Sequence, residues 1–447
     1  MDRNPSERIN DFCEVDLGFT EAEVRAEAAR CIQCKKPKCV NGCPVGIDIP
    51  AFIHACETGE FREAARIIKK DNMLPAICGR VCPQETQCQG ECVLGNKDTP
   101  ISIGHLERFV ADWERQNGVE APAKFPATGK KIAVVGSGPA GLSAAAELAR
   151  LGHEVTVFES LHEAGGVLMY GIPAFRLPKE IVQAEIEQVI ALGAEIRTNH
   201  VVGRSVPVEE LLAYDAVFLG TGAGLPYFMG LPGENLCGIY SANEFLTRVN
   251  LMGADKFPAH DTPVKFGKKV VVIGGGNVAM DAARVARRMG SEVTLMYRRG
   301  ESDMPARLDE VRHAKEEGVT FMCCTNPVAF LAGENNAVAG VKAIRMELGT
   351  PGDDGRCSFF PVEGSNFTID ADVVIEAIGQ GPNPLLLRML PELSRNRNGS
   401  IAVNCLGQTS MPGVYAGGDV ATGAATVILA MGTAKDAARG IDKMLRK

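Results

Sequence analysis

The sequence predicts an α/β chain in which two parallel-sheet domains follow a small α-helical domain. Eight of its cysteines gather in two tight groups between residues 31 and 92. Two glycine-rich turns, at 136–141 and 274–279, each follow a short apolar run and precede a helical stretch. The 447 residues are also enough for about three folding units.

The composition argues against several classes of protein. Hydrophobic residues make up 45% and charged residues 23% of the chain, which is ordinary globular usage. No apolar run reaches the roughly 18 residues of a membrane span, and the first twenty residues lack the apolar core of a signal peptide. The net charge of −8 disfavours a nucleic-acid binder. We therefore expect a cytoplasmic protein that binds neither membrane nor nucleic acid.

The cysteine-rich segment is predicted to be helical between its cysteines. Thr20 and Glu23 form a capping box ahead of the stretch 21–31. Apolar residues then recur at helical spacing in two further stretches, 49–53 and 61–68. We expect a small α-helical domain over residues 1–125.

The clustered cysteines indicate a metal site. They are Cys31, Cys34, Cys39 and Cys43, followed by Cys78, Cys82, Cys88 and Cys92. Without an export signal, such clustering favours metal ligands over a disulfide scaffold. Soft sulfur ligands suit both zinc and iron–sulfur clusters, but the first group runs consecutively, contains no His and ends in Cys-Pro, unlike usual zinc sites. We expect two [4Fe-4S] clusters, with zinc or plain thiols as the alternatives.

The ferredoxin pattern suggests how the two groups share their clusters, although the middle gap of the first group is four residues rather than two. In that pattern three cysteines bind one cluster and the Cys-Pro cysteine crosses to the other. The first cluster set is then Cys31, Cys34, Cys39 and Cys92. The second cluster set is Cys43, Cys82 and Cys88, with a fourth ligand left open between Cys78 and Glu107.

The first glycine-rich turn has the setting of a dinucleotide site. Residues 131–135 read as a buried strand, a helical stretch follows the turn, and the next strand ends at Glu159. The glycines let the backbone approach a pyrophosphate at the helix N-terminus, and the Glu159 carboxylate can take the ribose hydroxyls. The candidate contacts in the turn are Gly136, Gly138, Pro139, Ala140 and Gly141.

The second turn repeats this arrangement with one informative change. Its candidate contacts are Gly274, Gly276, Asn277 and Val278. At the position that corresponds to Glu159 the chain has Tyr297, followed by Arg298 and Arg299. Arginines accommodate the 2′-phosphate that a carboxylate would repel. We therefore expect NADP(H) here, with solvated surface arginines as the alternative.

The C-terminal segment is expected to return to the first sheet domain. A strand runs into Gly417, Gly418 and Asp419, and Thr426 then opens a helix. In flavoproteins with two dinucleotide domains, such a segment covers the flavin, which points to FAD at the first turn. We expect the FAD domain over 126–258 and 377–447, with the NADP(H) domain, 259–376, inserted in it. This makes two Rossmann-like domains behind the helical iron–sulfur domain.

Several motifs together resemble the small subunit of NADPH-dependent glutamate synthase and its relatives. They are the cysteine groups, GSGPAG, GGVLMYGIPAFRLPK at 165–179, GGGNVAMD at 274–281, YRR, MPA at 304–306 and AGGD. The relatives include the NADPH-binding subunit of NADH-dependent ferredoxin:NADP oxidoreductases, a sulfide dehydrogenase subunit and the N-terminal half of dihydropyrimidine dehydrogenase. The similarity covers essentially the whole chain and does not single out one member.

The resemblance adds Gly166, Asp419 and Thr426 to the expected FAD contacts and keeps a non-cysteine ligand at the second cluster possible. Family members commonly have Thr at the position of Val278, so one hydroxyl contact is expected to be lost. Thioredoxin reductases share the two-domain layout but carry a CxxC in the nicotinamide domain, where this chain has only Cys323 and Cys324. We nominate no catalytic residue, because no His falls in a motif.

The expected parts convert paired electrons into single ones. Nicotinamides exchange hydride and clusters exchange one electron, and a flavin can do both. The chain has no visible site for a further substrate, so we expect it to pass electrons to or from a partner subunit, within a hetero-oligomer. The glutamate synthase large chain is the first candidate. The alternatives are an electron-bifurcating complex with a ferredoxin- or NAD-linked flavoprotein, and a non-catalytic dinucleotide-binding scaffold.

Overall fold

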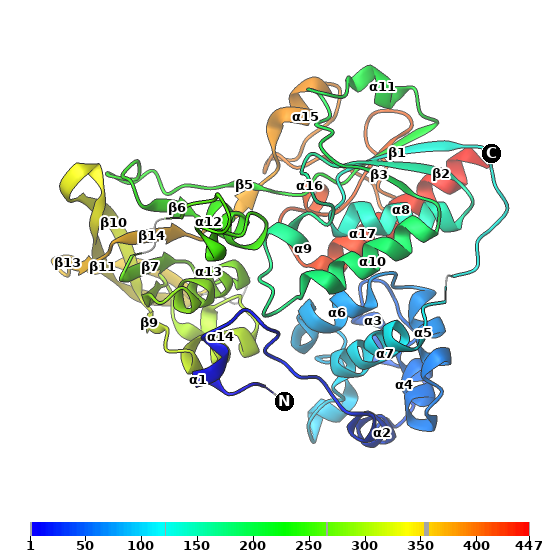
Figure 1. Ribbon diagram of the computed structural model, residues 1–447, viewed down its shortest axis with the longest axis horizontal. Helices are drawn as coiled ribbons and strands as arrows, with labels where there is room; N and C mark the ends of the chain where they lie inside the picture. The colour runs from blue at the N-terminus through cyan, green and yellow to red at the C-terminus, as the bar shows by residue number, and fades with distance from the viewer. Residues whose placement is uncertain (1, 121, 265–266, 353–356, 447) are drawn as a thin grey trace.

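The computed structural model describes residues 2–120, 122–264, 267–352 and 357–446. Three lobes are visible in Figure 1: a helical domain, a parallel-sheet domain above it, and a second sheet domain to one side. This arrangement confirms the predicted fold class. Among the described residues, no helix is both long and apolar enough to cross a bilayer.

The helical domain carries both cysteine groups. Its helices are α2 (Glu21–Ala29), α3 (Lys38–Asn41), α4 (Ile49–Thr58), α5 (Phe61–Lys69), α6 (Pro75–Val81) and α7 (Ile103–Asn117), with 3₁₀ turns η1 (Gln84–Thr86) and η2 (Val93–Asn96). The predicted capping box is present, since Thr20 Oγ1 accepts from the Glu23 amide and the Glu23 carboxylate accepts from the Thr20 amide. Helices α6 and α7 cross closely because Gly79 has no side chain: a Cβ there would lie 2.6 Å from the backbone nitrogen of Arg108.

The first sheet has the order β16-β4-β1-β2-β3, with every pair parallel. Its strands are β1 (Lys131–Val135), β2 (Glu154–Phe158), β3 (Glu195–Arg197), β4 (Ala216–Leu219) and β16 (Val414–Ala416). The C-terminal segment therefore returns to this sheet beside β4. Further helices of this domain are α8 (Pro139–Arg150), α9 (Val167–Tyr170), α10 (Lys179–Ala191), α11 (Val208–Leu212), α15 (Pro384–Met389), α16 (Asp419–Thr422) and α17 (Val427–Leu445).

Helices α8, α10 and α17 form a layer between this sheet and the helical domain (Figure 1). Their buried side chains belong to one apolar core that runs from the sheet through the layer into α4–α7. Residues on the opposite sheet face, such as Ala133 and Val217, form a separate core with α15 and the C-terminal loops. The helical domain and the first sheet domain are thus joined by a shared core.

The second sheet has the order β6-β14-β7-β8-β9, again all parallel. Its strands are β6 (Ile239–Ser241), β7 (Lys269–Ile273), β8 (Glu292–Met296), β9 (Thr320–Met322) and β14 (Val373–Glu376). Helices α12 (Ala242–Asn250), α13 (Asn277–Arg288) and α14 (Leu308–Glu316) cover one face, with the 3₁₀ turns η3 (Ala254–Lys256) and η4 (Glu301–Asp303) beside them. The sheet begins at residue 239 rather than 259, because β6 pairs with β14 before the glycine-rich strand enters.

An antiparallel meander covers the other face of the second sheet. It comprises β10 (Thr325–Ala332), β11 (Val338–Pro351), β12 (Cys357–Pro361) and β13 (Phe367–Asp370), with η5 (Glu334–Asn336) between the first two strands. Its apolar side chains pack against Val271, Ile273 and Val374 of the parallel strands. The sequence analysis did not predict this layer.

The two sheet domains are joined by a pair of crossover segments. They meet in a short antiparallel ribbon of β5 (Leu225–Pro226) and β15 (Gln380–Gly381). Asn243 Nδ2 donates to the Gly224 carbonyl (2.9 Å) and also to the Gln380 side chain, which ties the ribbon to α12. The glycine-bearing segments 219–223 and 377–381 therefore lie at this junction.

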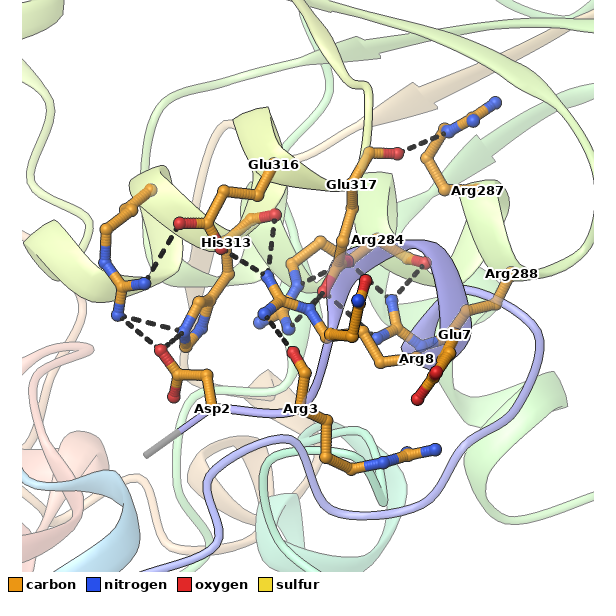
Figure 2. A network of polar contacts seen from close by, with 12 residues as sticks. Asp2, Arg3, Glu7, Arg8, Arg284, Arg287, Arg288, His313, Glu316 and Glu317 are labelled. Atoms are coloured by element: carbon orange, nitrogen blue, oxygen red, sulfur yellow. Dashed lines mark hydrogen bonds and ion pairs between the residues drawn. The ribbon is translucent and has the colours of Figure 1, made fainter.

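The N-terminal arm, residues 2–16, departs from the predicted helical domain. It carries the short helix α1 (Pro5–Arg8) and packs against α13 and α14 of the second sheet domain (Figures 1 and 2). Arg8 is fully buried there, with Nε 2.8 Å from Glu317 Oε1 and Nη2 2.9 Å from Glu316 Oε2. Glu317 also pairs with Arg284 and Arg288 on α13. A buried cation needs such carboxylates, which the helical domain does not offer at this point.

The far end of the arm returns to the helical domain. Glu14 lies 2.7 Å from Arg80 Nε, and Asp16 lies 3.3 Å from Arg108 Nη1. The arm therefore contacts the second sheet domain through Arg8 and the helical domain through its acidic residues. It acts as a strap between the two.

We expect Arg8→Ala to release the arm and to lower the free energy of unfolding by about 2 kcal/mol. We expect a smaller loss of stability than for a buried ion pair whose remaining member is left without a counter-charge, because Glu317 still pairs with Arg284 and Arg288. Limited proteolysis of the arm and thermal unfolding measure this. The control is Arg3→Ala, whose partly exposed pair with Asp11 should be worth less than about 1 kcal/mol. Equal effects of the two substitutions would contradict the assigned role of Arg8.

Candidate functional site

The first glycine-rich turn connects β1 to α8, and at several of its glycines a side chain would collide with neighbouring backbone. A Cβ on Gly141 would lie 1.8 Å from the Gly136 carbonyl oxygen, and one on Gly166 would lie 2.8 Å from Gly138 Cα. Gly136 also has φ +96, which L side chains rarely adopt. Pro139 begins α8 at the first turn, where its missing N–H costs nothing. Free amides at this helix start are suited to a pyrophosphate.

The carboxylate of Glu159, which directly follows β2, accepts hydrogen bonds from this turn. Its Oε2 accepts from the Ser137 amide (2.9 Å) and hydroxyl (2.5 Å), and its Oε1 accepts from the Leu161 amide (2.8 Å). The Ser137 hydroxyl in turn accepts from the Gly165 amide (3.0 Å). Glu159 therefore fixes the loop that carries Gly166 beside the turn. Ser137 and Gly165 were not singled out by the sequence analysis.

The C-terminal segment brings Asp419 to the same place. A Cβ on Gly418 would lie 2.7 Å from the Ala140 Cβ, so the Gly-Gly-Asp turn touches the start of α8. Burial raises the pKa of Asp419 to about 6. Tyr170 lies near both Glu159 and Asp419: burial, and then these two carboxylates, raise its pKa to about 12. Tyr170 lies in the 165–179 motif, but the sequence analysis did not single it out.

The second glycine-rich turn connects β7 to α13. A segment that begins at Met304 lies on it: the Ala306 amide donates to the Gly275 carbonyl (3.2 Å), and the Arg307 amide donates to Asn277 Oδ1 (2.9 Å). Tyr297, at the position of the ribose-binding acid, packs its ring on Gly275, where a Cβ would lie 2.7 Å from the ring. Its hydroxyl donates to the Asp303 carbonyl (2.9 Å).

Arg298 and Arg299 follow directly and lie side by side. The guanidinium carbons lie 4.6 and 5.0 Å from the centre of the Phe359 ring. Partial burial, and then the charge of Arg299, lower the pKa of Arg298. Arg298 makes no ion pair with any described carboxylate. Two adjacent cations held on an aromatic ring are suited to a phosphate group.

The first cluster set surrounds one cavity in the helical domain. All four of its members, Cys31, Cys34, Cys39 and Cys92, line the same pocket. The rest of the lining is mostly apolar, with Lys38 and Glu91 as its charged members. Burial, and then the charge of Cys92, raise the pKa of Cys39 to about 11. Within the described part of the chain, no three His, Cys, Asp or Glu side chains converge closely enough for a single ion. A four-iron cluster instead spreads its ligands over separate irons.

The second cluster set gathers between α6 and α7. Burial, and then the charges of Glu107, Cys82 and Cys43, raise the pKa of Cys88. Glu107 also adds to the raised pKa of Cys43, for which burial is the main cause. Glu107 itself is buried, which raises its pKa to about 8, and it accepts from Asn72 Nδ2 (2.7 Å).

Cys78 lies on the other side of Asn72 and faces α17. Its Sγ is 3.8 Å from Asn72 Oδ1 and 3.5 Å from Met431 Sδ. Two further contacts join this region to α17: Gln87 Nε2 lies 3.5 Å from Thr426 Oγ1, and a Cβ on Gly432 would lie 2.7 Å from the Pro44 carbonyl. The neighbours of Cys43 and Cys88 therefore adjoin the helix that Thr426 begins.

Two family models match the chain. Residues 8–119 match dihydropyrimidine dehydrogenase domain II, 4Fe-4S cluster, and residues 130–435 match pyridine nucleotide-disulphide oxidoreductase. The chain is 38% identical to the glutamate synthase [NADPH] small chain of Escherichia coli K12, covering 96% of this chain and 93% of that one. The corresponding values for the Azospirillum brasilense small chain are 37%, 98% and 93%. The chain belongs to the glutamate synthase small-chain family.

The family includes longer proteins. The chain is 41% identical to the NADP(+)-dependent formate dehydrogenase subunit beta of Moorella thermoacetica, but spans only 60% of it, with 92% of this chain covered. Among solved structures, Mycobacterium tuberculosis FprA in complex with NADPH shares the fold, with TM-score 0.61, 22% identity and coverage of 71% of this chain and 85% of that one. Thioredoxin reductase of T. acidophilum has TM-score 0.53 and 21% identity, with coverage of 71% of this chain and 100% of that one.

Membership of the glutamate synthase small-chain family confirms an iron–sulfur flavin oxidoreductase that uses NAD(P)H. It favours a 4Fe-4S domain over the zinc alternative. The relatives are subunits of larger oxidoreductases, as their names as small or beta chains say. The glycine-rich turns support dinucleotide binding independently of these relatives, because a Cβ at their glycines would occupy the space that the close backbone approach needs.

Glu376 is a buried acid at the end of β14, next to the crossover into β15. Its oxygens lack a well-formed hydrogen bond among the described residues, and burial, followed by the charge of the neighbouring Glu234, raises its pKa to about 8. The folded chain thus holds a proton that the unfolded chain loses near its ordinary value of 4.5. Stability contributed by this group is present below that value and is lost as pH rises towards 8.

We therefore expect Glu376→Gln to flatten the fall in stability between pH 5 and pH 8, and to stabilise the chain at pH 8 by about 2 kcal/mol. Unfolding by urea at the two pH values measures the difference. Glu363→Gln, at an exposed position of the same domain, is the control. A parallel pH profile for wild type and Glu376→Gln would show that Glu376 does not hold the proton.

Proposed function

We propose that the chain exchanges hydride between NADP(H) and FAD, and exchanges single electrons with a partner chain through two [4Fe-4S] clusters. The observation that carries this proposal is the position of α17. The Gly418 amide of the Gly-Gly-Asp turn donates to Thr433 Oγ1 on this helix (2.8 Å). The same helix meets the neighbours of Cys88 and Cys43, because Gln87 Nε2 lies 3.5 Å from Thr426 Oγ1 and Gly432 lies against Pro44. FAD supplies the chemistry that links the two, because a flavin accepts hydride and releases single electrons.

The protein's contribution is orientation and electrostatics. In the FAD domain, backbone amides at Gly138–Gly141 would take the pyrophosphate, and Glu159 would receive the ribose. Asp419 and Tyr170 lie where they can contact the remainder of the cofactor. In the second sheet domain, Asn277 begins the helix whose N-terminus would take the nicotinamide dinucleotide.

Two features support NADP(H) rather than NAD(H). The acid that would accept a free ribose 2′-hydroxyl is replaced by Tyr297, whose ring is packed down on Gly275. The adjacent arginines, Arg298 and Arg299, present their charges without described carboxylate partners. Val278 contributes no hydroxyl, so the phosphate contacts depend on backbone amides and these arginines.

We propose the first cluster set as ligands of the outer cluster and Cys43, Cys82, Cys88 and Glu107 as ligands of the inner one. Glu107 is favoured over Cys78 because its charge acts on both Cys43 and Cys88. Cys78 is the alternative: its thiol contacts Cys82 but also lies against Met431 on α17. Electrons would then pass between FAD, the inner cluster, the outer cluster and the partner chain. The exposed Ile32 lies beside the outer cavity, where a partner could approach.

The partner proposed first is a glutamate synthase large chain, since small chains of that enzyme match over nearly the whole sequence. The second candidate is an electron-bifurcating complex with a ferredoxin- or NAD-linked flavoprotein. The Moorella match supports a partner other than a glutamate synthase large chain, because that relative is named as a subunit of a formate dehydrogenase. Glutamine-dependent NADPH oxidation on mixing with a large chain separates the two.

We expect Arg298→Ala to lower kcat/KM for NADPH about tenfold to hundredfold, since a charge-assisted hydrogen bond contributes about 1.5–3 kcal/mol. The value for NADH should change little, because NADH lacks the 2′-phosphate. Anaerobic reduction of an artificial dye measures both. Arg345→Ala is the matched control, as Arg345 also lies 4.6 Å from a phenylalanine ring in the same domain. Equal losses with both nucleotides would contradict a phosphate contact.

We expect the anaerobically purified chain to contain about eight irons and eight sulfides, and Cys92→Ser to contain about half. Cys13→Ser, at an exposed cysteine outside both groups, is the control. Glu107→Gln should also lose about half of the iron, whereas Cys78→Ser should keep it. Metal and sulfide analysis with electron paramagnetic resonance measures the outcome. Retention of all iron in Glu107→Gln, with loss in Cys78→Ser, would assign the ligand to Cys78.

A further inference from the structure

Arg307 joins the nicotinamide turn to the helical domain. It follows the Met304–Ala306 segment and precedes α14, so its backbone belongs to the second sheet domain. Its amide donates to Asn277 Oδ1 at 2.9 Å, directly at the start of α13. Its side chain, 10% exposed, points away from that turn and crosses to the helical domain.

The side chain binds three acceptors on one segment of the helical domain. Nη1 donates to the Arg80 carbonyl (3.2 Å), Nη2 donates to Gln84 Oε1 (3.3 Å), and Nε donates to Glu85 Oε1 (3.3 Å). This segment, 80–85, contains Cys82 of the second cluster set. The planar guanidinium satisfies all three directions at once, which a lysine ammonium on a flexible stem cannot match.

The segment that receives Arg307 is itself held rigidly. The Arg80 guanidinium, 3% exposed, pairs with Glu14 of the N-terminal arm and with Asp112 of α7, both at 2.7 Å. Gln84 Nε2 donates to the Gly79 carbonyl (3.2 Å), and a Cβ on Gly104 would collide with the Gln84 amide. Arg307 is therefore anchored to a fixed part of the helical domain.

The opposite side of α14 contacts the FAD domain. Glu310 Oε1 lies 3.0 Å from Arg176 Nε, and Arg176 Nη1 donates to both oxygens of Asp281 on α13 (2.9 and 2.8 Å). Arg176 belongs to the 165–179 segment that carries Gly166. The nicotinamide turn is thus bounded by the FAD domain on one side and by the helical domain, through Arg307, on the other.

We propose that Arg307 is a positioning residue for the hydride step. It holds the nicotinamide turn on the helical domain, and because that domain shares its core with the FAD domain, it fixes the spacing between the two dinucleotide sites. Reacting atoms must lie about 3–3.5 Å apart, and a displacement of about 1 Å can cost about a hundredfold in rate. The inference rests on the proposed hydride exchange between NADP(H) and FAD.

The test uses the complete chain with its cofactors. Arg307→Met removes the donors and keeps the aliphatic stem, and Arg307→Lys restores one charge. Lys315→Met is the control, because Lys315 lies on the same helix but pairs with Glu301 inside its own domain. Anaerobic stopped-flow at saturating NADPH, with and without deuterium at C4, gives the hydride rate. Titration with NADP⁺ gives its Kd, and hydrogen exchange reports the amides of 80–85.

We expect Arg307→Met to reduce flavin about tenfold to hundredfold more slowly, with a Kd for NADP⁺ within about threefold of wild type. Arg307→Lys should recover part of the rate, and the amides of 80–85 should exchange faster in Arg307→Met than in the control. An unchanged rate, or a loss found only in the Kd, would overturn the inference. If NADPH fails to reduce wild type while exchange at 80–85 still depends on Arg307, the proposed function fails and the tether alone remains.

Discussion

The packing of α17 is the constraint on which the rest of the structure depends. This helix lies between the first sheet and the helical domain, and its residues reach both. Thr433 Oγ1 accepts from the Gly418 amide of the first sheet domain (2.8 Å), Met431 touches Cys78, and Lys435 donates to the Val45 carbonyl (3.2 Å), two residues after Cys43. Small residues make the approach possible, as at Gly432 against Pro44. One rigid element thus sets the separation between flavin and cluster, which a hinged linker could not do.

The two dinucleotide domains are connected quite differently. The β5–β15 ribbon joins them, and the 165–179 segment reaches the second sheet domain: Phe175 packs in the core around α12 and α13, and Asn250 Nδ2 donates to the Tyr170 carbonyl (3.1 Å). Polar contacts further fix their relative placement: the arm through Arg8, the Arg176–Asp281 pair and Arg307. These contacts are buried and charged, so they are strong only in one geometry. The helical domain is therefore joined to the first sheet domain by a shared apolar core. The second sheet domain is positioned mainly by specific polar contacts.

The electrostatics of the site follow from burial rather than from local sequence. Glu107, Glu376 and Asp419 all have raised pKa values because each lies away from solvent, in three different parts of the molecule. Arg8 and Arg284 are fully buried, and the carboxylates of Glu317 and Glu310 face them. Charged groups of both signs are placed where the domains meet, which explains how a chain of ordinary composition holds three lobes together.

The sequence by itself determined the elements whose spacing is local. A glycine-rich turn between a buried strand and a helix requires only neighbouring residues, so both turns, the capping box at Thr20 and the cysteine groups could be found in the sequence. Tertiary structure alone decided which groups meet over long separations. Tyr170 beside Asp419, Glu107 beside Cys88, Arg8 against Glu317 and Arg307 on the 80–85 segment all pair residues from different elements. The spacing of residues along the sequence does not reveal such contacts, because they form only when helices and strands pack against one another. The sequence analysis also missed the early start of the second sheet at β6 and the antiparallel meander. Whether a short segment forms a strand, and with which partner, depends on the neighbouring strands and the packing around them.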